Sequence, residues 1–532
     1  MKKIINVFKH KDQHREIGFL LLLLAFSILF RRVGLKHGFP LLTHPDEFVI
    51  IKPVLYMTNN LTLNPGRFSR PDQTLYLLNF LFLNLISFIK YGVNMGQAYA
   101  DHILDFYYYG RLMIAVMGAL IPIVAYGIGK AIKPKLAVPA ALVFAFFPLY
   151  VSNSLILTSD VPITLFTLIV TYFTLRYLNT ESKQYLWAAV FFAAVNTAEK
   201  YPGLLSLGIV FAGVLIQTIR NKDLSLKEIV WSVVRRCLLL LGLFVIALFI
   251  VAPFLFIEFP KVVQALTFEA RDTHLGADGL NWFGNFWFYC KILYKYMTVL
   301  GILLFGLGIW VAVRTKDLRI IILLYGFAYM IALSVLGLHW ERWALPMAIT
   351  PLMLIAFGIE FIWQKREKLH FLQLLLILIS ILFIFEQAVY AVEIPVKKKF
   401  TDTRVVSQVY CENNGINQSN TIYEGYSPLY PTFYKQIFDE YQNLDPQKEY
   451  IILSKPIYRR FYAEPERYFD EIQTYTAIRN DNQLIATFSP HPHPDNTISR
   501  IDNIYYFIKF RLGLTDEIRY NGPELEIYKI VN

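Results

Sequence analysis

Apolar stretches about 20 residues long recur along this 532-residue chain, and they constrain its fold more than any other feature. Lipid offers a backbone no hydrogen-bonding partners, so a stretch of this length crosses a bilayer as a helix. The sequence therefore predicts a polytopic α-helical membrane protein with about eleven transmembrane helices. The candidate spans begin near Ile17, Phe106, Leu136, Val161, Tyr185, Tyr201, Cys237, Phe286, Ile320, Trp343 and Leu369.

The charge composition agrees with a membrane protein. Only 17% of the residues are charged, against about 25% in a typical soluble domain. The net charge of +11 arises from Lys and Arg in short loops beside the apolar stretches. Residues in such loops orient a membrane protein, so we do not interpret them as a nucleic-acid-binding surface. Cys237, Cys290 and Cys411 are too few for a disulfide framework or a cysteine metal site.

The basic loops also predict an orientation. Lys and Arg gather at the N-terminus and in the loops around 130–135, 176–183, 220–236 and 314–319, whereas the intervening short loops are poor in both. This positive-inside pattern places the N-terminus in the cytoplasm of a plasma (inner) membrane and, with an odd number of spans, the C-terminus outside.

One apolar stretch does not fit this pattern as a span. Leu75–Ile89 is short and carries Asn79 and Asn84. Counting it as a span would reverse the side of every later loop. We therefore interpret it as a helix that lies in the membrane interface.

The composition turns polar near residue 393. We divide the chain into a transmembrane domain, 1–392, with a first outside loop at about 36–105, and a C-terminal extracytoplasmic domain, 393–532. This second part is expected to be a compact α/β domain, with a loose tail as the alternative. Its predicted elements are a helix at 403–413, strands at 421–426, 449–453 and 525–530, and a turn at Asn521–Pro523.

The motif HPDE, His44–Glu47, places two adjacent carboxylates in the first outside loop. Adjacent side chains point in different directions, so one carboxylate can act as a general base while its neighbour positions it or binds a metal ion. We assign catalytic roles to Asp46 and Glu47, with a divalent metal ion as the one cofactor that they suggest. The alternative is an ordinary first turn of a helix, where Pro, Asp and Glu are common.

Two further sites of charge interrupt apolar sequence on the same side. Asp160 follows Thr158 and Ser159 at the start of a span, where it either caps a helix or faces a cavity. Glu199 and Lys200 end an apolar stretch, where charges are costly. They form either a mutual ion pair or a site in which Lys200 holds a phosphate.

Three more groups belong to this side of the membrane. Arg111 lies near the start of a span, and Glu341 and Arg342 lie in the motif HWERW. Each Arg either clamps a phosphate or extends to the interface. His274 lies in a glycine-bearing outside loop, where it is either structural or a ligand.

Carboxylates and cations at one membrane face suit a lipid-linked donor with a phosphate leaving group. The cations stabilise the departing phosphate, and a carboxylate deprotonates the acceptor. A phosphate leaves without a protonating acid, so one base suffices and a single displacement with inversion is expected. The residues that we assign to substrate binding are Arg111, Asp160, Lys200, His274, Glu341 and Arg342.

The order of the motifs resembles that of a known family. HPDE, YGRLMIAVMGALIP, SDVPITLFTLIVTYFTLRYL, AEKYPGLL, THLGADG and HWERWALPMAITPLMLIAFGIEF follow one another as in the membrane glycosyltransferases of family 39. That family includes protein O-mannosyltransferases and lipid A aminoarabinose transferases. The resemblance covers nearly the whole chain and implies the GT-C fold and a polyprenyl-phosphate sugar donor. The outer domain lacks an evident sugar-repeat motif, so the acceptor stays open among a lipid, a glycan and a protein.

Two other classes of protein are alternatives. A secondary transporter typically shows internal repeats, broken helices and ionisable groups near the membrane midplane, whereas here the charges gather at one face. A non-catalytic membrane assembly factor would tolerate the loss of Asp46.

Overall fold

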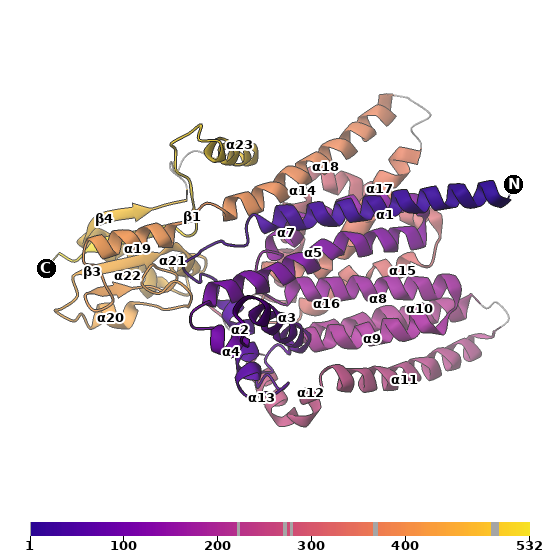
Figure 1. The fold of residues 1–532 in the computed structure, drawn as a ribbon, viewed down its shortest axis with the longest axis horizontal. Coiled ribbons are helices and arrows are strands. Elements are labelled where there is room, and N and C mark those ends of the chain that lie inside the picture. The colour runs from indigo at the N-terminus through magenta and orange to yellow at the C-terminus, as the bar shows by residue number, and fades with distance from the viewer. Residues whose placement is uncertain are drawn as a thin grey trace.

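The computed structural model describes residues 2–220, 224–269, 274–276, 280–364, 371–490 and 499–531, with side chains from residue 14 onward. Lys222, in one of the predicted basic loops, and Leu369, at a predicted span start, lie outside these residues. The chain forms a long helical bundle with a smaller α/β domain at one end, and the N-terminus lies at the opposite end (Figure 1).

The helices of the bundle run along its long axis and coincide with the predicted spans (Figure 1). Among the described residues, eight helices are long and apolar enough to cross a membrane, and two shorter apolar helices accompany them. The total of about eleven spans stays a prediction, because α1 and α9 are helical but more polar than these. The bundle helices are α1 Lys2–Arg32, α5 Ile103–Ile132, α6 Ala137–Ala145, α7 Pro148–Asn153, α8 Asp160–Thr180, α9 Lys183–Glu199, α10 Leu207–Ile219, α11 Leu226–Val251, α14 Trp282–Thr315, α15 Ile320–Leu323, α16 Tyr325–Leu333, α17 Ile349–Gln364 and α18 Phe371–Lys398.

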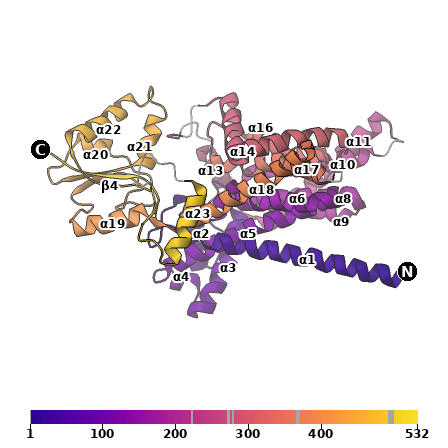
Figure 2. The same ribbon diagram turned by 90° about the horizontal axis from the view of Figure 1, so that it is seen from above.

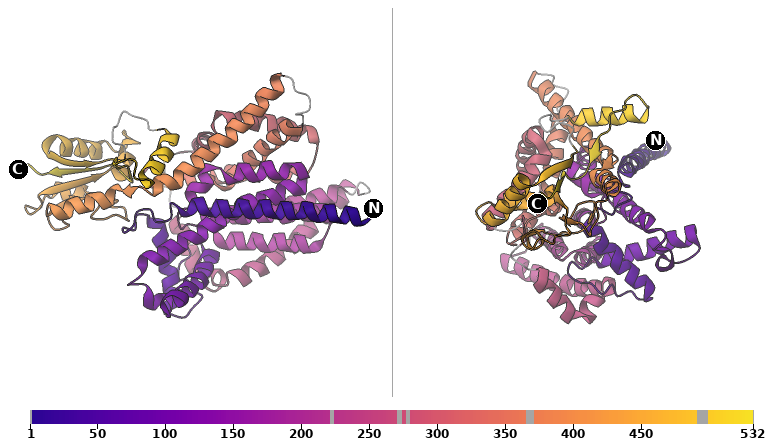
Figure 3. Two further views of the ribbon diagram at one scale, coloured as in Figure 1. Left: turned by 45° about the horizontal axis from the view of Figure 1, so that its top comes forward. Right: turned by 90° about the vertical axis from the view of Figure 1, so that its left-hand side faces the viewer.

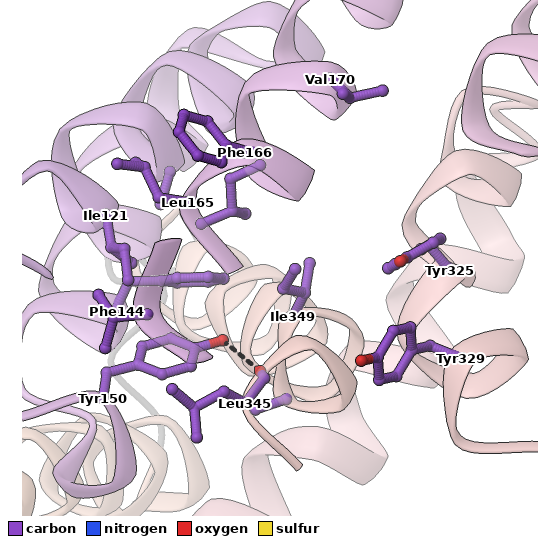
Figure 4. Packing of buried hydrophobic residues seen from close by; sticks show 14 of the residues in the cluster. Ile121, Phe144, Tyr150, Leu165, Phe166, Val170, Tyr325, Tyr329, Leu345 and Ile349 are labelled. Atoms are coloured by element: carbon purple, nitrogen blue, oxygen red, sulfur yellow. Dashed lines mark hydrogen bonds between the residues drawn. The ribbon is translucent and has the colours of Figure 1, made fainter. Parts of the chain in front are cut away.

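The bundle is apolar both inside and outside, as a lipid-facing fold requires. Leu239 and Phe249 of α11 are exposed on its surface. Inside, aromatic side chains from α6, α7 and α16 fill the space between helices (Figure 4). The one polar atom of Tyr150 is satisfied, because its hydroxyl donates to the carbonyl oxygen of Leu345 at 3.1 Å.

The helices α14 and α17 approach closely at two glycines. A Cβ atom on Gly308 would lie 1.8 Å from the carbonyl oxygen of Leu354, and one on Gly358 would lie 2.5 Å from that of Leu304. A larger residue would therefore push α17 away. This contact fixes the helix that follows the short 3-10 turns η3 (Glu341–Ala344) and η4 (Pro346–Ala348).

The first outside loop is largely helical: α2 spans Pro45–Asn59, α3 Gln73–Tyr91 and α4 Met95–Ala98. By length and composition alone α3 qualifies as a span. Figure 2 instead shows it projecting sideways from the bundle, in agreement with the predicted interfacial helix. Asn84, which interrupts its apolar run, donates to the Thr58 hydroxyl of α2 at 2.9 Å. The bundle end also carries η1 Pro134–Leu136, η2 Tyr201–Ser206, α12 Phe254–Ile257 and α13 Phe259–Glu269.

The C-terminal domain is built on a four-stranded sheet of order β2-β3-β6-β4. The strands β2 and β3 are parallel, and the other pairs are antiparallel. A two-stranded parallel sheet, β1 with β5, joins the domain to the end of α18. The elements are β1 Thr401–Asp402, α19 Thr403–Asn413, β2 Thr421–Tyr423, α20 Phe438–Gln442, β3 Tyr450–Ser454, α21 Lys455–Tyr462, α22 Phe469–Asp481, β4 Gln483–Phe488, α23 Arg500–Arg511, β5 Tyr520–Asn521 and β6 Leu525–Lys529.

The expectation of a compact α/β domain agrees with this arrangement. The predicted helix at 403–413 is present with its predicted ends, and the three predicted strands are present with ends shifted by one to three residues. Their apolar residues form the sheet core, in which Ile422, Ile451 and Leu453 are fully buried. The helix α18 runs past residue 393 to Lys398, so the α/β elements begin after the boundary that the composition suggested.

Candidate active site

Asp46 and Glu47 form the first turn of α2. Pro45 occupies the first helical position, and the His44 ring accepts a hydrogen bond from the Asp46 amide at 3.3 Å. This is the helix start that the sequence left as the alternative to a catalytic role. Because the two carboxylates are neighbours on one helix turn, they point to different surroundings.

Glu47 is fully buried and pairs with Arg111. The Arg111 Nε and Nη2 atoms donate to the two carboxylate oxygens, both at 2.7 Å. The Leu157 amide also donates to Glu47, at 3.1 Å. The second terminal nitrogen of Arg111 donates to the carbonyl oxygens of Leu35, at 2.7 Å, and His37, at 2.9 Å.

Neither member of this pair lines a cavity, and Arg111 is fully buried. The guanidinium therefore does not reach the position of a phosphate that the sequence suggested for it. Its bonds join α5 to α2 and to the segment after α1. The geometry likewise does not fit Glu47 as a metal ligand, since Arg111 and Leu157 occupy both of its oxygens.

Asp46 points the other way, toward a cavity. Its carboxylate accepts hydrogen bonds from Arg342 and, at 3.4 Å, from Arg70. Burial by itself would raise the pKa of Asp46, but the two guanidinium groups outweigh burial and hold this pKa well below its usual range. Asp46 is consequently ionised throughout the physiological pH range.

Asp160 and Lys200 form the second ion pair of the site. The Lys200 Nζ lies 2.6 Å from one oxygen of Asp160, and the Arg342 Nε lies 3.6 Å from the other. The ammonium of Lys200 also lies 5.9 Å from the centre of the Trp343 ring. The sequence considered an ion pair between Lys200 and Glu199, whereas the structure pairs Lys200 with Asp160.

A cavity of about 1450 Å³ opens between the bundle end and the C-terminal domain. Nine Lys and Arg residues line it, against four Asp and Glu residues. Its floor holds Asp46, Arg70, Lys200 and Arg342. An apolar wall comes from α13, the end of α16 and the segment after α16, and the roof comes from α18, the β5–β6 turn and α21. The apolar wall is formed by Leu266, Phe268, Leu333, Leu336, Leu338, Trp340 and Trp343.

Four of the eight predicted site residues line this cavity: Asp46, Lys200, His274 and Arg342. Glu47, Arg111 and Asp160 lie buried beneath its floor. The His274 ring meets the Trp340 ring edge to face, with centroids 4.9 Å apart.

Glu341 does not join the other predicted site residues. Its carboxylate lies 3.3 Å from the Lys295 Nζ and accepts a hydrogen bond from the Tyr296 hydroxyl. Both of these partners, Lys295 and Tyr296, lie on α14, and the Glu341 side chain is 40% exposed. The structure thus places Glu341 apart from Asp46, although Arg342 is its neighbour in sequence.

Sequence reasoning missed several cations of the cavity. Arg70 lies in the segment RFSRPD of the first loop and contacts Asp46 and, at 3.8 Å, Asp72. The sequence did contain a signal for Arg70, namely two arginines close to an aspartate in this outside loop. The roof cations Arg459 and Arg460 lie in KPIYRRF, within a domain whose orientation over the bundle the sequence did not define.

No three His, Cys, Asp or Glu side chains among the described residues are arranged to hold a metal ion. The donor set around Asp46 is also cationic, with Arg342 and Arg70 in contact with it. A divalent ion would have to displace one of these groups, so the floor residues do not fit a resident metal in this arrangement.

Two comparisons with known proteins found proteins to which this chain is similar. The family model described as dolichyl-phosphate-mannose-protein mannosyltransferase matches residues 108–257. The structure is similar to that of ArnT from Cupriavidus metallidurans in the apo state, with 12% identity, a TM-score of 0.53 and coverage of 89% of this chain and 96% of that one. It is also similar to the same protein bound to undecaprenyl phosphate, with 13% identity, a TM-score of 0.50 and coverage of 97% and 98%. No curated protein matches the chain.

The helical bundle, the charged floor at one end of it and these likenesses define the class: a multi-pass membrane protein with the GT-C fold. The resemblance to GT-C membrane glycosyltransferases that the sequence motifs predicted is thereby confirmed.

Proposed function

We propose that this chain transfers a sugar from a polyprenyl-phosphate donor to an acceptor at the outer membrane face. The observation that carries this function is a carboxylate, Asp46, held in a cavity beside Arg342, Arg70 and Lys200. Base and phosphate-binding groups thus share one floor. The matches to a mannosyltransferase family model and to ArnT with undecaprenyl phosphate support the same chemistry.

The two kinds of cavity wall suit the two parts of such a donor. The cations of the floor would hold its phosphate, because charge-assisted hydrogen bonds to phosphate are strong. The apolar wall, with Leu333, Leu336 and Leu338, includes and follows the end of the short apolar helix α16 and would receive the first isoprene units. The donor would then reach the cavity from the bilayer with its chain still in lipid.

The reaction is a single displacement at the anomeric carbon. The acceptor hydroxyl oxygen attacks that carbon, and its proton passes to Asp46. The bond from the carbon to the phosphate oxygen breaks, and polyprenyl phosphate leaves with the negative charge that Lys200 and Arg342 stabilise. One displacement inverts the anomeric configuration.

The carboxylate of Asp46 is not free to accept a proton from an acceptor in this structure, because Arg342 and Arg70 both donate hydrogen bonds to it. A donor phosphate would compete for these guanidinium groups. If these guanidinium groups gave part of their hydrogen bonding to the phosphate, the pKa of Asp46 would rise toward its ordinary value. Asp46 would then be a better base. The donor would therefore bind before the acceptor.

Four further cations of the cavity, one from the first loop and three from the roof, bear on the acceptor. Arg67, Lys398, Arg459 and Arg460 line the cavity but form no ion pair with a carboxylate in the described part of the chain. Unpaired cations facing a cavity favour an anionic ligand. We propose that the acceptor carries negative charge near its reacting hydroxyl, whether it is a lipid, a glycan or a protein.

The side of the membrane completes the proposal. The positive-inside pattern supports an inner-membrane protein whose cavity and C-terminal domain face outward. Membrane-impermeant thiol labelling in intact cells should reach a cysteine placed near His274 or in the C-terminal domain, but not one near Lys133. Labelling near Lys133 from outside would reverse the orientation and would make α3 a span.

The function is tested by supplying purified protein with polyprenyl-phosphate sugars and by mass spectrometry of lipid-linked sugars in a deletion strain. Accumulation of one such lipid in the deletion strain, and its consumption in vitro by the parent but not by Asp46→Asn, would support the transferase. Uptake of a soluble solute without glycosyl transfer would favour the transporter. Full complementation by Asp46→Asn would favour an assembly factor.

A further inference from the structure

The helix α23, Arg500–Arg511, stands apart from the rest of the C-terminal domain and lies against the end of α18 (Figure 1). Figure 2 shows it running across the direction of the spans, and the right-hand view of Figure 3, along the bundle, shows it at the periphery. A helix perpendicular to the spanning helices lies parallel to the plane of the membrane.

One face of α23 is fixed to α18. The Asn503 amide donates to the Glu393 carboxylate at 2.8 Å, and both groups are buried. The Tyr506 ring meets the Phe400 ring edge to face at 5.2 Å. These contacts hold α23 beside the last turns of α18 through two different kinds of interaction.

The opposite face of α23 is apolar and exposed. Ile501, Tyr505, Ile508 and Leu512 are spaced by four, three and four residues, which places them on one side of a helix. They are 57%, 55%, 49% and 66% exposed. The fixed face therefore does not account for the hydrophobic pattern of this helix.

The depth of α23 identifies what covers this face. Glu393 lies five residues before the end of α18 at Lys398, which corresponds to about 7–8 Å along a helix. Leu382 and Phe385, further back on α18, are exposed and apolar, as expected in contact with lipid. In a membrane that covers the exposed apolar part of α18, α23 would therefore lie where the hydrocarbon gives way to headgroups.

Charged residues flank the exposed face. Lys509 and Arg511 lie in the last turn of α23, on opposite edges of the apolar stripe. Cations beside an apolar face are typical of helices that lie in the interface of an anionic membrane.

We infer that α23 is an interfacial helix that inserts Ile501, Tyr505, Ile508 and Leu512 into the outer leaflet, with Lys509 and Arg511 at anionic headgroups. This is a lipid-binding surface separate from the cavity, and it does not rest on the transferase activity.

Contacts within the protein connect α23 to the roof of the cavity. Arg519, beside β5, donates to Asn503 of α23 at 3.3 Å. The next residues, Tyr520 and Asn521, pair with the chain that leaves α18, and Asn521 lines the cavity. Insertion of α23 would thus set the height of the C-terminal domain above the cavity floor.

The test places a fluorophore on the exposed face of the full-length protein in lipid vesicles. Ile508→Cys is labelled with an environment-sensitive dye, and the equally labelled parent gives the background from its own cysteines. Asp445→Cys, in the exposed loop between α20 and β3, is the control. Lipids brominated near the top of the acyl chain should reduce the Ile508→Cys signal about twofold or more, and the Asp445→Cys signal should not change.

A second variant separates lipid contact from proximity alone. Adding Leu512→Asp to the labelled chain should relieve the quenching. Quenching should also be stronger in vesicles that contain phosphatidylglycerol, an anionic lipid, and Lys509→Gln with Arg511→Gln should remove this dependence. Quenching of Ile508→Cys by aqueous iodide instead of by brominated lipid would overturn the inference. Protection from both quenchers, with a doubled mass on cross-linking, would overturn it in favour of a second copy of the chain.

Discussion

Two neighbouring carboxylates of this protein have opposite surroundings. Glu47 is closed off, with both oxygens held by Arg111 and a backbone amide. Asp46 faces a cavity, and its partners Arg342 and Arg70 are themselves partly accessible. Both are carboxylates paired with arginine on one helix turn. The difference in burial gives the first pair a structural role and makes the second available for chemistry.

The comparison also shows what an ion pair at the end of a membrane bundle can do. A buried pair stabilises little relative to a well-packed apolar pair, but the loss of one partner leaves an uncompensated charge. A pair at a cavity can instead exchange partners with an anionic ligand. The difference between Glu47 and Asp46 leads to four predictions, given from the largest expected effect to the smallest.

The largest effect is expected for Glu47→Gln. The change leaves the Arg111 guanidinium buried without its counter-charge, and such a loss costs about 3–5 kcal/mol of stability. We expect a low yield and a strongly lowered melting temperature in detergent. The paired change Glu47→Leu with Arg111→Met removes both charges and should recover much of the stability. A stable, fully active Glu47→Gln protein would remove the distinction between the two carboxylates.

Asp46→Asn should have the reverse effect. The fold should persist, because Asp46 is partly exposed and its neighbours keep contact with water. Transfer should fall by roughly 10²-fold or more, because the general base is lost. Asp105→Asn, at a surface pair with Lys90, is the matched control and should not alter the rate. Normal transfer by folded Asp46→Asn would exclude Asp46 as the base.

Lys200→Gln should have a smaller effect than either of these changes. We expect donor affinity to fall about tenfold, the usual size of one lost charge-assisted hydrogen bond. Asp160 would lose its partner as well, although Arg342 lies 3.6 Å from its other oxygen. Glu199→Gln is the control, because Lys200 pairs with Asp160 instead. The measurement is a titration of both variants with polyprenyl phosphate, and equal affinities for Lys200→Gln and the parent would reject the phosphate contact.

The sequence predicted the fold well where a local pattern is strong. The helix at 403–413 was predicted with its observed ends, since Asp402 caps it and its apolar residues recur at helical spacing. The prediction that Leu75–Ile89 lies in the membrane interface came from a charge count over distant loops, and α3 projects sideways from the bundle as that prediction requires (Figure 2). The strand β4 and the helices α20, α21, α22 and α23 were not predicted, because each is short and has few or no buried apolar residues.

The candidate site was predicted in part for a similar reason. Asp46, Lys200, His274 and Arg342 could be placed at one face from topology alone. The pairing of Glu47 with Arg111, and of Asp160 with Lys200, depends on distances in the folded chain that no spacing along the sequence encodes. Arg70 and the roof cations depend on how a loop and a separate domain fold over the floor.

A third carboxyl group sharpens the comparison and carries the smallest expected effect. Glu424, at the end of β2, is fully buried like Glu47 but has no arginine in hydrogen-bonding contact. Its oxygens meet the Ser454 amide and the Tyr475 hydroxyl. Burial raises the pKa of Glu424 to about 8, so the group is largely protonated in the folded domain at neutral pH.

The direction of the pH dependence follows from this raised pKa. Between the ordinary pKa of about 4.5 and about 8, the folded domain holds a proton that the unfolded chain releases, so stability falls as the pH rises through this window. Glu424→Gln cannot ionise and should flatten that slope. Hydrogen exchange of the β2 and β3 amides, compared between parent and variant at each pH so that the chemical rate cancels, measures it. An unchanged slope would mean that Glu424 is ionised when folded, and that burial does not keep this carboxyl group protonated.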